Sequence, residues 1–204
     1  MLSVHFLKLC RFKQNQFIQM NTNTFNITIH MVSSLDGIIS KKDNSVSWFE
    51  TTDFYEKGIT GQDPEQFLKT IDCYVMGSRT YEHALELSKS YGWPYGDLPT
   101  IVVSQRELIT HKQNIELYSG NLNNLVKERL KPYFHNVWVV GGAILAQAFL
   151  RLNLADEIRL SILPIILGEG QLLFDQIAQE KELHLKDATA YKNGMVELLY
   201  AIKK

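Results

Sequence analysis

The sequence is short of cysteine, of net charge and of long apolar runs. Of its 204 residues only Cys10 and Cys73 are cysteines. This number excludes a disulfide framework and a cysteine-based zinc site and favours a reducing compartment, so we expect a cytoplasmic protein without a metal. No apolar run reaches about 18 residues, which argues against a membrane-spanning helix. A net charge of −1 at pH 7 gives no basic surface for binding nucleic acid.

Acidic residues are missing from the beginning of the chain. Residues 1–35 contain no Asp or Glu, whereas three basic residues occur within 8–13. The short apolar stretch there is interrupted by His5 and Lys8, which excludes a signal-peptide core. We expect residues 1–22 to be an unstructured extension without chemistry, with an organelle transit peptide as the alternative. Residues 23–204 are expected to form a single domain.

Strands and helices are expected to alternate along this domain. Apolar and polar residues alternate with period two from Phe25 to Met31, which predicts a strand. Further apolar runs predict strands at 72–76, 100–103, 115–118, 137–140 and 157–164, and helical spacing predicts helices at 78–89, 122–130 and 143–152. This order favours the α/β class with a mainly parallel sheet. The last two runs, 183–191 and 195–202, are joined near Asn193-Gly194 and predict an antiparallel hairpin at the sheet edge.

The first strand-to-helix turn has the residue types that bind phosphate. A buried strand ends at Gly77, and a helix opens with Ser78, Arg79 and Thr80. The first N–H groups of a helix have no partner within the helix and lie at the positive end of its dipole, which suits an anion. Arg79 can add a forked bond to a phosphate. The alternative is that Ser78 or Thr80 caps the helix and Arg79 is solvated.

Two further turns follow buried strands in the same way. Gly141 and Gly142 separate an apolar strand from an apolar helix, without the G-x-G-x-x-G pattern of a Rossmann dinucleotide fold. Ser104, Gln105 and Arg106 follow the strand at 100–103. Because the carboxyl ends of parallel strands meet at one edge of the sheet, we expect the three turns to converge on a ligand. The alternatives are a tightly packed glycine turn and a solvated loop.

Taken together, these segments resemble the dihydrofolate reductase fold. More specifically, they resemble the reductase domain of the bifunctional riboflavin-biosynthesis deaminase–reductase and its stand-alone relatives. The motifs that carry the resemblance lie in order at 34–37, 76–82, 102–104, 140–143, 154–160, 164–170 and 173–174, and it covers about residues 25–202. It implies a three-layer α/β fold. The zinc deaminase signature of the bifunctional proteins is absent from this sequence.

The resemblance also implies an activity and a set of site residues. The activity is NADPH-dependent hydride transfer to a C=N or C=O group of a small heterocycle, most like 5-amino-6-(5-phosphoribosylamino)uracil. The pyrophosphate and the 2′-phosphate would be held by Gly77, Ser78, Arg79 and Thr80, and the adenosine would be flanked by Val103, Ser104 and Gln105. The pyrophosphate and the nicotinamide would also face Gly141 and Gly142. The nicotinamide ring would lie along Val32, Ile39 and the loop between them. Asp36 is expected to shape that loop, and Arg106 to meet the 2′-phosphate beside Arg79.

Reduction needs a proton as well as a hydride. Dihydrofolate reductases use an acid soon after the first strand, and the interval from Trp48 to Asp53 matches theirs. Asp53 is therefore the first candidate for the proton donor and Glu50 the second. The alternative is that Asp53 caps a helix beginning at Phe54 and that Glu50 is solvated.

Alternatives remain for the function and for two segments of the chain. The enzymatic alternative is a true dihydrofolate reductase, and the non-enzymatic one is a nucleotide-binding module that has lost turnover. His30 is expected to be a surface or cross-strand residue, and residues 93–97 either rim the substrate pocket or cover the core. The related stand-alone reductases commonly pair, and the apolar run 162–167 is too hydrophobic to stay exposed, so we expect a homodimer.

Overall fold

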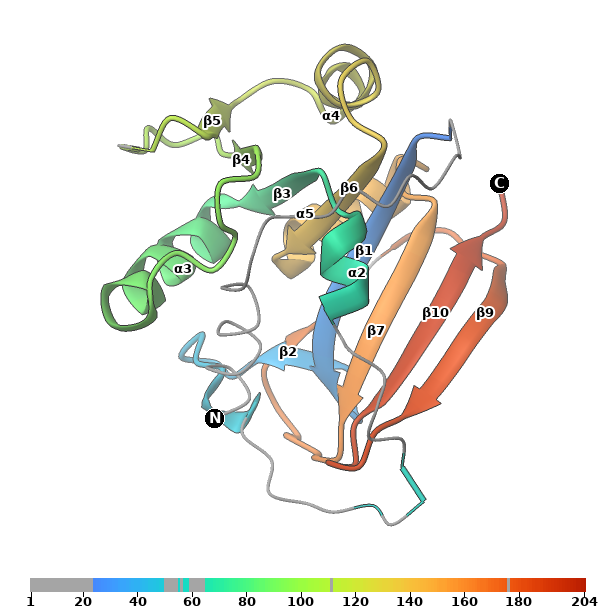
Figure 1. Ribbon diagram of the computed structural model, residues 1–204. Helices are drawn as coiled ribbons and strands as arrows, with labels where there is room; N and C mark the ends of the chain where they lie inside the picture. Colours follow the sequence, from blue (N-terminus) through green and yellow to red (C-terminus); the bar gives the residue numbers. More distant parts are fainter. Residues whose placement is uncertain (1–23, 50–54, 56, 59–64, 111, 176) are drawn as a thin grey trace.

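The computed structural model describes residues 24–49, 55, 57, 58, 65–110, 112–175 and 177–204. Within them the main sheet has the strand order β5-β4-β3-β6-β1-β7-β10-β9 (Figure 1). The strands are β1 (Asn26–Ser34), β3 (Cys73–Gly77), β4 (Thr100–Val103), β5 (Ile115–Tyr118), β6 (Asn136–Gly141), β7 (Glu157–Leu163), β9 (Leu183–Ala190) and β10 (Val196–Ile202). Neighbours from β5 to β7 are parallel, whereas β10 pairs antiparallel with both β7 and β9. The predicted mainly parallel sheet with an antiparallel hairpin at its edge is confirmed.

Helices cover both faces of this sheet. They are α2 (Glu65–Thr70), α3 (Ser78–Tyr91), α4 (Leu122–Asn124) with its continuation η3 (Leu125–Leu130), α5 (Ala143–Arg151) and the short 3-10 turn η2 (Ser47–Phe49). On one face, α5 and η3 pack Phe149 and Leu125 into a core with Val139. On the other face, α2 and α3 pack Phe67 and Tyr81 into a separate aromatic cluster. Because strand side chains alternate between faces, each inner strand serves both layers, and the predicted three layers are present.

The helix predicted for residues 122–130 changes its winding halfway. After one α-turn, η3 is π-helical, and the Lys131 N–H donates to the Val126 carbonyl five residues earlier. Leu125 and Leu130 are both fully buried in the core. The wider turn brings these two residues, five apart in sequence, to the same side of the helix, which an ideal α-helix does not do.

A second, small sheet joins the loop after β1 to the loop after β7. It consists of β2 (Ile38–Ser40) and β8 (Gln171–Leu172), which pair antiparallel. Gly168 and Gly170 shape the turn before β8, and a Cβ on Gly170 would lie 2.3 Å from the Ser40 carbonyl oxygen. Only glycine therefore lets the two loops approach so closely.

The sequence analysis made two predictions about apolar segments, one about membrane-spanning helices and one about the run 162–167. Among the described residues, no helix is long and apolar enough to cross a bilayer. In the apolar run 162–167, Leu163 is buried in the core, whereas Ile166 is 68% exposed. The homodimer stays a prediction.

Candidate functional site

The two glycine turns meet at the carboxyl edge of the sheet. β3 and β6 are parallel neighbours, so the turns at their ends lie side by side. A Cβ on Gly77 would lie 3.7 Å from both the Gly141 carbonyl oxygen and the Gly142 nitrogen. The peptide bond between Gly141 and Gly142 is cis, and Gly141 has a φ of +123° with Met31 directly against it. The space that a side chain on Gly77 would fill is thus bordered by the backbone of the Gly141-Gly142 turn and by the Leu145 Cβ at 4.0 Å.

Both helices that start at these turns lack a side-chain cap. Gly77 is the N-cap residue of α3 and Gly142 that of α5, and neither helix start receives a capping hydrogen bond from a side chain. The alternative in which Ser78 or Thr80 caps α3 is therefore wrong. The Oγ1 of Thr80 instead lies 3.5 Å from the position that a Cβ on Gly142 would take. Two positive helix ends and a hydroxyl group converge here, which is an arrangement suited to an anion.

The third turn, after β4, is held by its own side chains. The Ser104 Oγ accepts a bond of 3.0 Å from the Arg106 N–H and donates one of 2.9 Å to the Arg106 carbonyl. The Gln105 Nε2 donates to the Ser119 carbonyl over 2.8 Å, and Val103 packs against the core. Ser104 and Gln105 therefore fix the shape of the loop, and β4 places it next to the Gly77 turn because β4 is the neighbour of β3.

The two candidate cations for a 2′-phosphate lie on the same side of α3. The Arg106 Nη2 donates to the Glu82 Oε2 over 2.9 Å, and both side chains are about half exposed. Glu82 is three residues after Arg79, so it lies on the same helix face. Arg79 is exposed and has no hydrogen bond or ion pair to any other described residue. One guanidinium group is therefore paired and the other open to solvent.

Asp36 clamps the loop between β1 and β2. Its carboxylate accepts bonds from the Ser34 hydroxyl, at 2.6 Å, and from the N–H groups of Gly168 and Leu167, at 2.8 and 3.1 Å. These bonds, the Ser34 one first, lower the pKa of Asp36 to about 2. Asp36 shapes this loop, as expected, by joining it to the Gly168 turn.

The two positions predicted for the nicotinamide side differ in their surroundings. Ile39 is buried in the main core. Val32 is half-buried and packs against a small cluster that contains Trp48, Leu163 and Met195. The side chain at Val32 therefore lies on the face of the sheet opposite to that of the main core, close to the end of β1.

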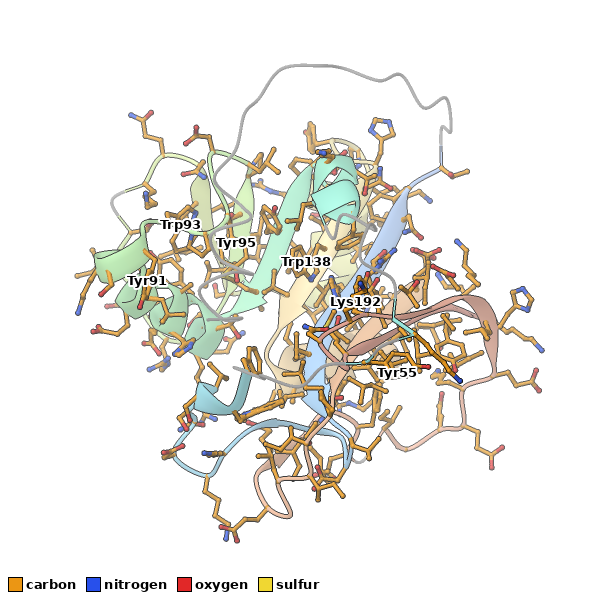
Figure 2. The ribbon with its side chains drawn as sticks, turned by 60° about the horizontal axis from the view of Figure 1, so that its bottom comes forward. Tyr55, Tyr91, Trp93, Tyr95, Trp138 and Lys192 are labelled. Carbon is orange, nitrogen blue, oxygen red and sulfur yellow. The ribbon has the colours of Figure 1, made fainter. Side chains whose placement is uncertain are left out.

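Both proton-donor candidates, Glu50 and Asp53, lie outside the described residues. Their described neighbours in sequence have defined contacts. Trp48 is buried beside Val32, and the Tyr55 N–H donates to the Lys192 carbonyl at the β9–β10 turn over 2.7 Å (Figure 2). The assignment of the donor stays a prediction.

The aromatic residues at 93–97 cover the core. Trp93 and Tyr95 lie close to each other (Figure 2), and their ring centroids are 5.3 Å apart. The Tyr95 ring centroid lies 4.9 Å from that of Tyr74 on β3. They pack on the second hydrophobic cluster together with Trp138. Of the two readings for this segment, the described contacts support the one in which it closes the aromatic layer.

The sequence patterns do not reveal a network of three buried polar residues and one half-buried arginine. His30, Arg159, Ser161 and Glu197 contact one another on β1, β7 and β10. His30 is 4% exposed, so the surface position expected for it is wrong, although its cross-strand contact to Ser161 is as expected. Burial, followed by the nearby charge of Arg159, lowers the pKa of His30 to about 3. One feature of the sequence could have indicated this network, because Glu197 is the only charged residue among the apolar residues of the last predicted strand, 195–202.

Other possible sites in the described part of the chain are weaker. No group of three or more His, Cys, Asp or Glu residues that suits a metal ion occurs among the described residues. A hollow of about 410 Å³ lies beside Thr100, Asn114 and Tyr133. It is at the amino end of β4, opposite to the glycine turns.

The sequence matches a known protein family and a protein of Bacillus subtilis. The model of the RibD C-terminal domain family matches residues 26–197. The uncharacterized protein YwjB of Bacillus subtilis (strain 168) is 28% identical over 172 residues, which cover 84% of this chain and 95% of that protein.

Two solved structures share the fold. A putative riboflavin biosynthesis protein from Shewanella sp. PV-4 has a TM-score of 0.74 and 22% identity, covering 88% of this chain and 100% of that one. The riboflavin biosynthesis reductase Rib7 of Saccharomyces cerevisiae has a TM-score of 0.54 and 17% identity, covering 91% and 93%. With the family match over most of its length, this chain belongs to the RibD C-terminal domain family.

Proposed function

We propose that this chain is an NADPH-dependent reductase that acts on a C=N or C=O group of a small heterocycle. Our first candidate for the substrate is 5-amino-6-(5-phosphoribosylamino)uracil. The observation that carries the proposal is the contact between the Gly77 turn and the Gly141-Gly142 turn, from which two uncapped helices begin. Membership of the RibD C-terminal domain family and the likeness to a riboflavin biosynthesis reductase support it.

The residues of this edge fit the cofactor. The uncapped N–H groups of α3 and α5 offer donors to a pyrophosphate, and Thr80 adds a hydroxyl group near Gly142. Glycine at all three turn positions leaves room for a ligand to approach the backbone. Arg79 and Arg106 lie on one side of α3, where they offer cations to an adenosine 2′-phosphate.

NADPH, when bound, supplies the hydride from its nicotinamide ring. The protein orients the two reactants and keeps water out of the contact between them. On this proposal, the Asp36 clamp holds the loop from Leu35 to Gly37 beside the nicotinamide, and Val32 lies beneath the ring. A protein carboxyl group or a water molecule delivers the proton, with Asp53 and then Glu50 as the candidates.

The test is NADPH oxidation, followed at 340 nm, with three kinds of candidate substrate. They are the aminouracil ribotide, dihydrofolate and a panel of small carbonyl compounds. We expect the ribotide to give the highest kcat/KM, and NADH to be the poorer cofactor. Preference for dihydrofolate would select the enzymatic alternative. NADPH binding without oxidation by any compound would favour the nucleotide-binding module, and absence of NADPH binding would overturn the proposal.

A further inference from the structure

A row of side chains crosses the sheet from the predicted nicotinamide position to the β10 strand. Val32 on β1 pairs with Ser161 on β7, and Ser161 pairs with Glu197 on β10. Paired residues point to the same face of a sheet, and strands are about 4.8 Å apart. Ser161 is therefore about 5 Å and Glu197 about 10 Å from Val32 within the sheet.

The carboxylate of Glu197 is held by three hydrogen-bond donors. Its Oε1 accepts from the Arg159 Nη1 at 2.5 Å and from the Tyr191 hydroxyl at 3.4 Å. Its Oε2 accepts from the Ser161 hydroxyl at 3.3 Å, and the His30 Nε2 lies 3.7 Å away. Glu197 is 9% exposed, and Ser161 is completely buried. The carboxylate is thus fixed on one side and faces Ser161 with the other.

Arg159 is also held from the helix side. Its guanidinium carbon lies 4.6 Å from the centre of the Phe67 ring on α2, and the same ring meets His30 edge-on at 5.0 Å. Burial and Glu197 raise the pKa of Tyr191 to about 12, so Tyr191 remains a donor. These contacts keep the Arg159–Glu197 pair in one geometry.

The two faces of these strands differ in character. On the opposite face, the same strands carry Ile29 and Ile158 in an apolar core. Burying an ion pair costs desolvation energy, and an apolar pair of similar volume is often as stable or more so. We therefore attribute this pair, whose Arg159 and Glu197 side chains are 21% and 10% exposed, to ligand binding beside the predicted nicotinamide position rather than to stability.

A second buried polar group belongs to the cluster around Val32. Trp48 is 5% exposed, and its indole N–H has no hydrogen-bond partner among the described residues. Trp48 belongs to the cluster against which Val32 packs. A buried N–H group without a hydrogen bond raises the free energy of the folded state. This N–H is therefore suited to an acceptor on a ligand, since the described residues supply none.

We propose that Glu197 is the substrate-anchoring carboxylate of this site, which accepts hydrogen bonds from N–H groups of the heterocycle. Arg159 and Tyr191 are positioning residues that hold Glu197, and Trp48 donates to a carbonyl oxygen of the same ring. The site thus selects a planar heterocycle that carries both amide N–H and C=O groups, as a uracil ring does. This inference rests on the proposed function. Glu197 binds the substrate and is distinct from the proton donor.

The decisive variant is Glu197→Gln, because the amide has nearly the same shape but presents donors where the carboxylate has an acceptor. We expect KM for the aminouracil ribotide to rise at least about tenfold, while the Kd for NADPH, from fluorescence titration, changes less than about threefold. Ser161→Ala is the second variant, with a smaller rise in KM in the same direction. Unfolding curves for each variant show whether the fold is retained.

Glu157→Gln is the matched control. Glu157 is on the same face of β7 and also forms an ion pair, with Lys186, but it lies at the amino end of the strand. It should leave KM and Kd unchanged. An unchanged KM in Glu197→Gln and Ser161→Ala, or equal losses of ribotide and NADPH binding, would overturn the inference. Failure of the proposed function is seen separately, in a wild-type chain that does not bind NADPH.

Discussion

Arg106 would have to share or break an existing ion pair to bind a phosphate, whereas Arg79 would not. Arg106 is paired with Glu82, whereas Arg79 has no partner among the described residues. A forked contact between a guanidinium group and a phosphate is charge-assisted, and exposure to solvent reduces it to the lower end of its range. We predict that Arg79→Ala weakens NADPH binding about tenfold and NADH binding less than about threefold. Titration of both cofactors into the variant measures the two values.

Arg106→Ala should act in the same direction as Arg79→Ala but more weakly, since its guanidinium is shared with Glu82. Glu82→Gln is the informative companion, because it frees Arg106 and removes a negative charge near the expected phosphate. It should strengthen NADPH binding relative to NADH. Equal losses for the two cofactors in Arg79→Ala, or none, would remove Arg79 from the 2′-phosphate site.

Sequence patterns identify residues whose role depends on the local structure around them. They miss residues whose role depends on contacts with a neighbouring strand that is distant in sequence. Gly77, Gly141 and Gly142 stand out because a glycine between a strand and a helix has a local meaning. Glu197 contacts Arg159 and Ser161, which are 38 and 36 residues away in sequence. Its meaning depends on the register of β7 and β10, which the pattern of either strand alone does not give.

At the scale of elements, the loop between β1 and β2 is joined to the Gly168 turn through Asp36. The bonds to Ser34, Gly168 and Leu167 need the ionised carboxylate, and they lower the pKa of Asp36 from its usual 3.8 to about 2. Because the pKa is lower in the folded state, this contribution to stability is complete above pH 3.8 and is lost as the pH falls through about 2.

We therefore predict that Asp36→Asn lowers the midpoint of thermal unfolding at pH 7 and flattens its fall between pH 4 and pH 2. Differential scanning calorimetry over this range compares the variant with the wild-type chain. Asp97, an exposed acid that forms no hydrogen bond or ion pair with another described residue, provides the control Asp97→Asn. Parallel pH profiles for wild type and Asp36→Asn would show that the clamp contributes nothing.

Element boundaries follow the sequence best in the short strands β4 and β5. The strands predicted at 100–103 and 115–118 are β4 and β5 with the same bounds. The helix predicted at 122–130 is only α-helical at its beginning, because the burial of both Leu125 and Leu130 favours a π-helical turn. Tertiary packing decides this change, and helical spacing alone does not reveal it.

At the scale of the whole molecule, the sheet order brings distant turns together. The ends of β3, β4 and β6 come from residues 77, 103 and 141 and are adjacent only because these strands are neighbours. Local periodicity predicts the strands but not their order, so the sequence placed the three turns at one edge of a parallel sheet without showing which strands are neighbours. The convergence of the glycine turns is now a described contact, whereas the cofactor, the proton donor and the homodimer stay predictions.

The central claim is that NADPH binds between the two glycine turns, and Gly77→Ala tests it. Gly77 has a φ of −79°, which alanine adopts freely, and its Cβ would meet only ordinary contacts at 3.7 Å. The variant should therefore fold as stably as the wild type, while its methyl group occupies space between the helix starts. Gly96→Ala, at a φ of +59° in the turn at residues 93–97, is the control for destabilisation without loss of binding.

The measurement is a fluorescence titration of NADPH into the wild-type chain, Gly77→Ala and Gly96→Ala, with thermal unfolding of each. The account predicts saturable binding by the wild type and by Gly96→Ala, and affinity at least about tenfold lower in a stably folded Gly77→Ala. No saturable binding by the wild type, or equal affinity in Gly77→Ala, would contradict it.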